Sequence, residues 1–172
     1  MLAAIAIGLY LFITKPDKAD EALAVKEQTW IYNTAEGVGP DSMRIARVRA
    51  LKPIRLSGRT ILTSTASAAY LQITLAHNYT GKRVTNAEIK AGDNTTARID
   101  QIIGDSLIAQ FDDQAPRAFK IIPGYMESYI ASSESFIKQV KASKKLKITA
   151  TFEASGTHTM EFNTSNLLWD FD

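Results

Sequence analysis

The stretch LKITATFEASGTHTMEFN, residues 146–163, shows most directly how this chain folds. Apolar side chains fall at every second position of its first half, at Leu146, Ile148, Ala150 and Phe152. This alternation is typical of a β-strand with one buried and one solvated face. It resumes at His158, Met160 and Phe162, after Gly156, which can adopt the positive φ of a tight turn. The stretch therefore predicts an antiparallel hairpin.

The strand pattern continues through most of the chain. It is regular from Ala69 to Leu75 and less regular at 29–32, 43–51, 60–65, 84–90, 97–102, 107–111 and 118–122. Turn-forming clusters such as Gly37 to Asp41 and Gly92 to Asn94 separate these segments. This spacing predicts a mainly β fold, an antiparallel β-sandwich or barrel-like domain.

One short helix, at about residues 132–142, is predicted between the strands. Ser132 or Ser133 is suited to cap its start, and Glu134 lies in the first turn, where the helix dipole favours an acid. Phe136, Ile137 and Val140 share one face. We expect this face to pack against the buried side of the hairpin, including Phe152. Positive charge is favourable beyond the carboxyl end of a helix, where the sequence has Lys141, Lys144 and Lys145.

The amino terminus predicts a membrane location. Residues 2–13 are apolar, but a dozen residues fall short of the roughly 20 that cross a bilayer as a perpendicular helix. We divide the chain into a hydrophobic anchor or signal segment at 1–14, a linker at 15–28 and a single β-rich domain at 29–172. The small residues of Ala22-Leu23-Ala24 lie too far beyond the apolar run for a typical cleavage site, which favours a retained tether. The alternative is a buried helix of a soluble domain.

Charge around the apolar segment orients it only weakly. Positive charge tends to stay on the cytoplasmic side of a membrane, and no Lys or Arg precedes Leu2. The charge of the amino terminus itself is therefore the argument for a cytoplasmic start. The expected location is the bacterial inner membrane, with a single N-terminal anchor and the domain in the periplasm.

Composition limits the chemistry that the chain can perform. Its 172 residues, 45% of them hydrophobic, are sufficient for one core of ordinary size. Cysteine is absent, which excludes disulfides, thiolate nucleophiles and cysteine-based zinc sites. The only histidines are His77 and His158, too few for a three-histidine centre. We predict no metal and no cofactor, and the net charge of +2 does not by itself imply a polyanionic partner.

One short block resembles a catalytic motif. Gly104-Asp105-Ser106-Leu107 resembles the first block of the GDSL-type esterases and lipases. The catalytic serine of that family requires a histidine that lies three residues after an Asp. In this chain the residue three positions before His158 is Ser155 rather than an Asp. We therefore interpret Gly104 to Ser106 as a turn between two strands and predict no catalytic residue. A hydrolase acting on an envelope polymer or ester remains the alternative function.

The segment 44–59 is the best candidate for a binding surface. It contains six basic residues and no acid: Arg44, Arg47, Arg49, Lys52, Arg55 and Arg59. Such a segment forms either a solvated strand face or a patch for an anionic lipid, a glycan or an acidic envelope protein. Aromatic residues do not interleave with the cations, which argues against nucleic acid. We select Arg44, Arg47, Arg49 and Arg55, with Arg47 and Arg49 on one strand face and Arg44 on the other.

The second half of the chain also resembles a family. Five features resemble the VasI-like accessory proteins of type VI secretion, which belong to a broad group of bacterial envelope proteins. These features are Phe111-Asp112-Asp113, the helix with Phe136-Ile137, the alternating strand from Leu146, Gly156 and a closing Leu167-Leu168-Trp169. The resemblance covers roughly residues 105–169 and, more loosely, Trp30 to Val48. It implies a non-enzymatic, mostly β envelope domain that acts as a binding or accessory module in secretion or envelope assembly.

Overall fold

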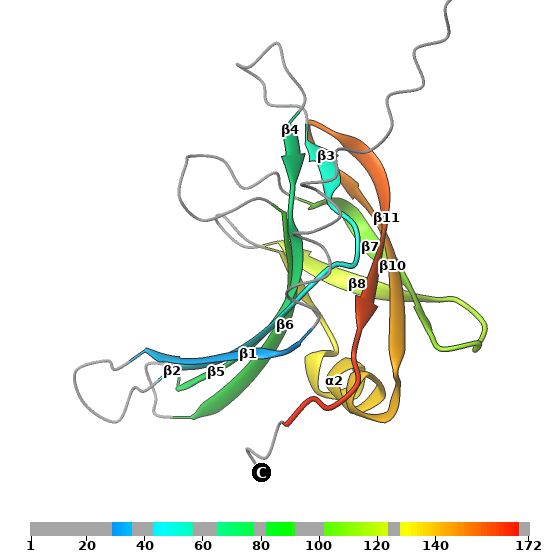
Figure 1. Cartoon of the computed structure of the whole chain (residues 1–172). Coiled ribbons are helices and arrows are strands. Elements are labelled where there is room, and N and C mark those ends of the chain that lie inside the picture. The colour runs from blue at the N-terminus through cyan, green and yellow to red at the C-terminus, as the bar shows by residue number, and fades with distance from the viewer. Residues whose placement is uncertain are drawn as a thin grey trace, which may run out of the picture.

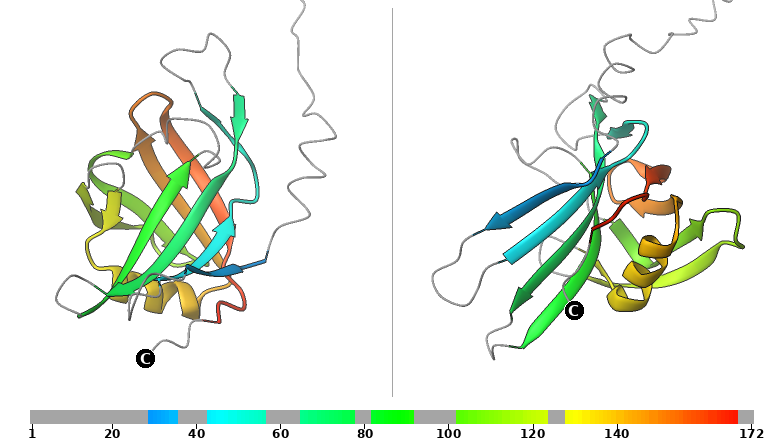
Figure 2. Two further views of the ribbon diagram at one scale, coloured as in Figure 1. Left: turned by 90° about the vertical axis from the view of Figure 1, so that its left-hand side faces the viewer. Right: turned by 60° about the horizontal axis from the view of Figure 1, so that its bottom comes forward.

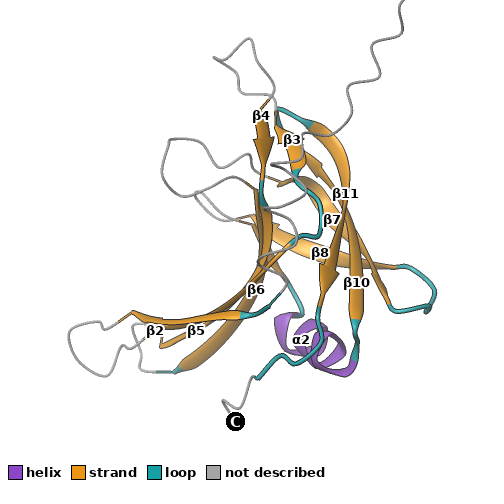
Figure 3. Cartoon of the chain, viewed as in Figure 1, coloured by secondary structure: helices purple, strands orange, loops and turns teal. Residues whose placement is uncertain are grey.

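The computed structural model describes residues 29–35, 43–56, 65–77, 82–91, 102–123 and 128–168. The elements of this part are β1 (Ile31–Ala35), β2 (Met43–Arg49), β3 (Ile54–Leu56), β4 (Thr65–Ser67), β5 (Ala69–His77), β6 (Arg83–Ala91), β7 (Ile102–Phe111), β8 (Arg117–Pro123), β9 (Ser128–Ile130), α2 (Ser133–Ala142), β10 (Lys145–Phe152) and β11 (Gly156–Asn163). Figure 3 shows that strands dominate, which confirms the mainly β prediction, and the described residues contain one short helix, as expected.

The predicted anchor at 1–14 and the linker at 15–28 lie outside the described residues, as do most of the strands predicted at 60–65 and 97–102. In the part of the chain that is described, no helix combines the length and the apolar character needed to cross a membrane.

Nine of the strands form one antiparallel sheet. Their order is β1-β2-β5-β6-β9-β8-β7-β10-β11, and β3 and β4 form a separate two-stranded sheet (Figure 1). The large sheet curls back on itself, because Ala50, directly after β2, forms a β-bridge with Phe162 of β11. The Leu51 N–H also donates to the Glu161 carbonyl oxygen at 2.7 Å. The two halves of the sheet therefore face each other (Figure 2). Their buried apolar side chains form one continuous core.

The C-terminal hairpin forms as predicted. Leu146 pairs with Phe162, Ile148 with Met160 and Phe152 with Gly156, whose φ is +79°. The apolar side chains that alternate along β10 are buried. On the opposite face, the hydroxyl oxygens of Thr149 and Thr159 lie 2.8 Å apart, as do those of Thr151 and Thr157. Period-two alternation thus places each face of this hairpin correctly.

The helix α2 fills an opening in the sheet at the lower end of Figure 1. One edge of β6 pairs with β5 along its whole length, whereas on the other edge the described part of the chain offers only the single pair of Glu88 with Tyr129 of the short strand β9. Ser133 bridges this opening: its hydroxyl accepts from the Ala87 N–H at 3.0 Å and donates to the Ile130 carbonyl oxygen at 2.6 Å. These bonds satisfy backbone groups that burial would otherwise leave unpaired. Ser132 occupies the N-cap position without a side-chain capping bond.

Three aromatic rings anchor the helix to the sheet. The Phe136 ring, fully buried, meets the rings of Phe111 and Phe119 edge to face, at centroid distances of 5.5 and 5.2 Å. Ile137 and Val140 are buried on the same face, as predicted. Edge-to-face contact adds to the stabilisation that burial of the rings provides.

The expected contact between Phe152 and the helix is wrong. Phe152 is buried, but it pairs with Ile102 at the far end of β10, whereas Leu146 pairs with Phe111 beside the helix. Six residues of strand span about 20 Å, which is too far for a contact between Phe152 and Phe136. Alternation indicates which face of a strand is buried but not what covers it.

The turn predicted at Gly104 to Ser106 is also wrong, because these residues lie within the continuous strand β7. The pairing of β7 with β10 is irregular here: Thr149 pairs with Ile108, whereas Thr151 pairs with Ile103. Gly104 has a φ of +95°, which only glycine adopts readily. The turn-forming composition therefore produces a bulge rather than a reversal of the chain.

Candidate functional site

A row of polar side chains crosses the outer surface of β2, β5 and β6. Arg47 pairs with Gln72 across the first two strands, and Gln72 pairs with Glu88 across the next two. The neighbouring row, Ala46, Ile73 and Ala87, is buried in the core, so alternation directs the polar row outward. We call this surface the outer face and define it by Arg47, Arg49, Tyr70, Gln72, Thr74, Glu88 and Lys90.

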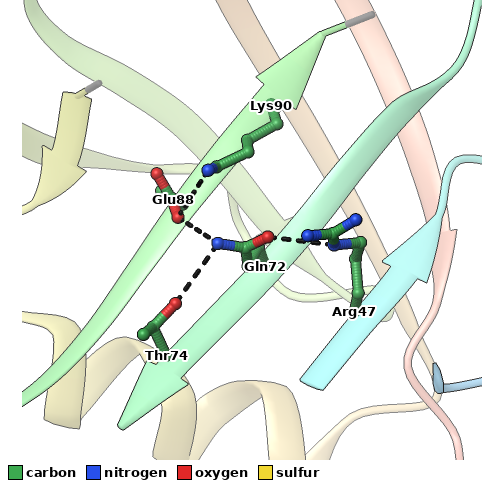
Figure 4. A network of polar contacts seen from close by, with 5 residues as sticks. All are labelled: Arg47, Gln72, Thr74, Glu88 and Lys90. Atoms are coloured by element: carbon green, nitrogen blue, oxygen red, sulfur yellow. Dashed lines mark hydrogen bonds and ion pairs between the residues drawn. The ribbon is translucent and has the colours of Figure 1, made fainter. Parts of the chain in front are cut away.

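Hydrogen bonds and an ion pair connect the row into a network (Figure 4). Arg47 Nε donates to Gln72 Oε1 at 2.9 Å. The Gln72 amide nitrogen donates to Glu88 Oε1 and, at 3.3 Å, to the Thr74 hydroxyl. Lys90 Nζ lies 3.4 Å from Glu88 Oε1. Gln72 therefore links a cation on one side to an anion on the other, a role that requires both ends of its amide.

Burial makes this network structurally important. Gln72 is 4% exposed and Glu88 is 3% exposed, although both lie outside the apolar core. A buried carboxylate is costly unless a cation and hydrogen-bond donors compensate it, and Lys90 and Gln72 supply both. The same bonds depend on the register of the three strands. The network thus holds β2, β5 and β6 in one alignment and keeps Arg47 in a defined orientation.

The structure brings together only part of the predicted basic patch. Arg47 and Arg49 are half-buried on the outer face, where the Arg47 guanidinium lies 5.9 Å from the centre of the Tyr70 ring. Arg44 is exposed and belongs to the opposite side of β2. Arg55 lies in β3, in the separate two-stranded sheet. Two of the four arginines therefore share a surface.

Sequence reasoning missed Gln72 and Glu88. Both occupy positions that alternation assigns to a solvated strand face, and no local pattern signals that such a position becomes buried. The spacing of Glu88 and Lys90 does indicate that they share a face of β6, but not that Gln72 of the neighbouring strand joins them.

An open groove lies near the outer face, between the edge of β6 and the start of α2. Its volume is about 530 Å³, and polar groups of several kinds line it, among them Lys82, Asn86, Tyr129, Ser132 and Glu134. Tyr129 is also the residue that pairs with Glu88, so the groove and the polar row are adjacent. This arrangement places cationic, amide, hydroxyl and aromatic groups along one side of the molecule.

The residues of the GDSL-like block do not form a catalytic arrangement. The Ser106 hydroxyl donates to Asp105 Oδ1 at 3.0 Å, and both residues are exposed. His158 Nε2 lies 3.0 Å from the Ser155 carbonyl oxygen. Serine and imidazole therefore have separate partners rather than the mutual hydrogen bond of a catalytic pair. Among the described residues, no group of three or more metal-ligating side chains converges.

Comparisons of the chain with protein families, curated proteins and solved structures find no match. The arrangement of charged and polar groups on the outer face therefore carries the functional proposal. The apolar character of residues 2–13 is a second basis for the functional proposal.

Replacing Gln72 with leucine should lower the free energy of unfolding by about 2 kcal/mol, because Glu88 loses a buried hydrogen-bond donor. Chemical denaturation of both proteins measures this difference. Gln139→Leu serves as a control, because Gln139 makes only a 3.4 Å hydrogen bond, to the Ser135 carbonyl oxygen on the helix surface. A loss at Gln72 no larger than at Gln139 would show that the network does not stabilise the sheet.

Proposed function

We propose that this protein is a non-enzymatic binding or accessory module of the bacterial envelope, tethered to the inner membrane with its β domain in the periplasm. The outer face binds an acidic partner protein through Arg47 and Arg49. The observation that carries this proposal is the hydrogen bond by which the buried Gln72 orients Arg47 on an otherwise polar strand surface.

A guanidinium held in place is well suited to recognition. Arg47 bonds to Gln72 through Nε, which leaves the two terminal amino groups for a planar, bidentate contact with a partner carboxylate. Orientation before binding reduces the side-chain entropy lost in the complex. Charge on such a face raises the association rate and selects partners of opposite sign.

Two features of the sequence support the location. The apolar segment 2–13 has the character of a membrane tether, and residues 105–169 resemble VasI-like envelope proteins. A role in secretion or envelope assembly follows from that resemblance.

Co-purification from gently solubilised membranes tests the binding role. The variant combines Arg49→Glu with Arg47→Gln, since a glutamate at position 47 would add a second carboxylate opposite Gln72, whose amide already donates to the buried Glu88. We expect mass spectrometry to identify a partner with the natural protein and to find at least tenfold less of it with the variant, while the melting temperature changes little. Recovery should also fall as salt increases, because salt screens surface charge.

The matched control removes two cations from another surface. Arg117→Gln and Lys120→Glu change exposed residues of β8 and match the charge changes of the test variant. The control should retain the partner. If the amount of partner recovered changed neither with the arginine substitutions nor with salt, the proposal would be contradicted. The aromatic surface near Tyr129 would then be the next candidate for binding.

A further inference from the structure

The helix α2, at the lower end of Figure 1, and the residues that follow it contain four exposed lysines. Lys138 and Lys141 are exposed residues of α2, the helix that buries Phe136, Ile137 and Val140. Lys144 lies between α2 and β10, and Lys145 is the first residue of β10. We call Lys138, Lys141, Lys144 and Lys145 the lysine end. All four are exposed and fall within residues 138–145, at the junction of α2 and β10.

Within the described ranges, the acids near the lysine end are few and partly engaged. The sequence has no acid between Ser135 and Phe152. Asp112 lies closest, and its Oδ1 accepts from the backbone N–H groups of Lys144 and Lys145, both at 2.9 Å. Asp113 follows in the same exposed turn, and Glu134 precedes Lys138 by about one helical turn. The lysines outnumber these three acids and extend farther along the chain.

The first described strand begins at this same end. Trp30 Nε1 donates to the Thr164 carbonyl oxygen at 3.4 Å, and the Thr164 N–H donates to the Lys144 carbonyl oxygen at 2.9 Å. The Thr164 hydroxyl also donates to the Ser143 carbonyl oxygen, at the end of α2. The chain thus enters the β domain beside the lysine end. Residues 2–13, which we assign to the membrane, precede this entry point.

An exposed apolar side chain lies near the lysines. Leu168 is 69% exposed, and its N–H donates to the Tyr32 hydroxyl at 2.7 Å. It lies four residues after Thr164, whose N–H donates to the Lys144 carbonyl oxygen. Figure 2 shows the same closeness of α2 and the C-terminal segment. Lysines next to an exposed leucine are a combination that suits the boundary between lipid headgroups and acyl chains.

We propose that the lysine end binds anionic phospholipid headgroups, with Leu168 at the interface. The proposal rests on the membrane location proposed above and adds a second, lipid-binding surface to the protein-binding outer face. Each lysine near an anionic bilayer raises the partition coefficient of the protein into that bilayer about fivefold. The exposed Leu168 favours a lipid surface over an acidic protein.

Vesicle partitioning of the full chain at limiting lipid tests this inference. The two probes are vesicles of phosphatidylcholine alone and vesicles that also contain phosphatidylglycerol, and the readout is the ratio of the two partition coefficients. Lys138→Gln with Lys144→Gln should reduce the anionic preference at least tenfold and leave partitioning into phosphatidylcholine unchanged. The control, Lys52→Gln with Lys120→Gln, removes two exposed charges elsewhere and should largely keep the preference.

The outcomes separate this inference from the proposed function. If the full chain failed to bind phosphatidylcholine vesicles, the membrane tether at residues 2–13 would be contradicted. The ratio of the two partition coefficients, in contrast, depends only on the attraction between charges. An unchanged ratio in the lysine variant, or an equal fall in the control, would overturn the lysine end as a lipid site. Loss of a co-purified acidic protein from the lysine variant, with the ratio unchanged, would instead assign this end to protein recognition.

Discussion

Replacing Phe136 with alanine should lower the free energy of unfolding by about 3 to 5 kcal/mol. The ring is fully buried and fits edge to face against Phe111 and Phe119. Its removal leaves a cavity where the helix meets the sheet and takes away both ring contacts. Urea denaturation followed by circular dichroism measures the loss.

Lys138→Ala is the control for this prediction, because Lys138 lies on the exposed side of the same helix. Its effect should stay within about 0.5 kcal/mol. A loss below about 1 kcal/mol for Phe136→Ala would contradict the assignment of α2 as part of the core, and a large change in the denaturant slope would indicate that the helix had detached.

Phe152→Ala should cost a similar amount, about 3 to 5 kcal/mol, at the opposite end of the core. Phe152 is 1% exposed and lies next to the hairpin turn, with the His158 ring 6.0 Å away. Neither Phe136 nor α2 contributes to this site, so the two losses should add in the double variant. Equilibrium unfolding of both single variants and the double variant tests the additivity.

Thr151→Ala changes the neighbouring residue on the outer side of the same strand and should cost about 0.5 kcal/mol. The Thr151 hydroxyl lies 2.8 Å from that of Thr157 in an exposed position, where water can replace the contact. Similar losses for Phe152→Ala and Thr151→Ala would mean that the buried and solvated faces of β10 are reversed.

Much of the fold is predictable from local pattern. The hairpin of β10 and β11, the strand β5 and the helix α2 appear where alternation or helical spacing indicates them. Two very short strands, β3 and β9, escape prediction because three residues contain too little periodicity. At Gly104 to Ser106 the local composition predicts a turn where the strand in fact continues. The error arises because glycine is compatible with a bulge as well as with a turn.

The candidate site was predictable only in part. The alternation along β2 correctly separates Arg44 from Arg47 and Arg49, because neighbouring residues of a strand face opposite sides. The partners of Arg47 could not be inferred, since Gln72 and Glu88 come from other strands whose pairing depends on the whole sheet. The binding role of the arginines stays a prediction.

By itself, the sequence determined the C-terminal hairpin, the strand β5, the helix α2 and their apolar faces, and the chemistry that cysteine and histidine content excludes. These properties depend on residues close together in the chain. Only the tertiary structure decided the order of the strands, the burial of Glu88 and the meeting of Trp30 with Thr164, which are 134 residues apart. Such contacts form because a curled sheet must close and cover its open end, a requirement that no local pattern encodes.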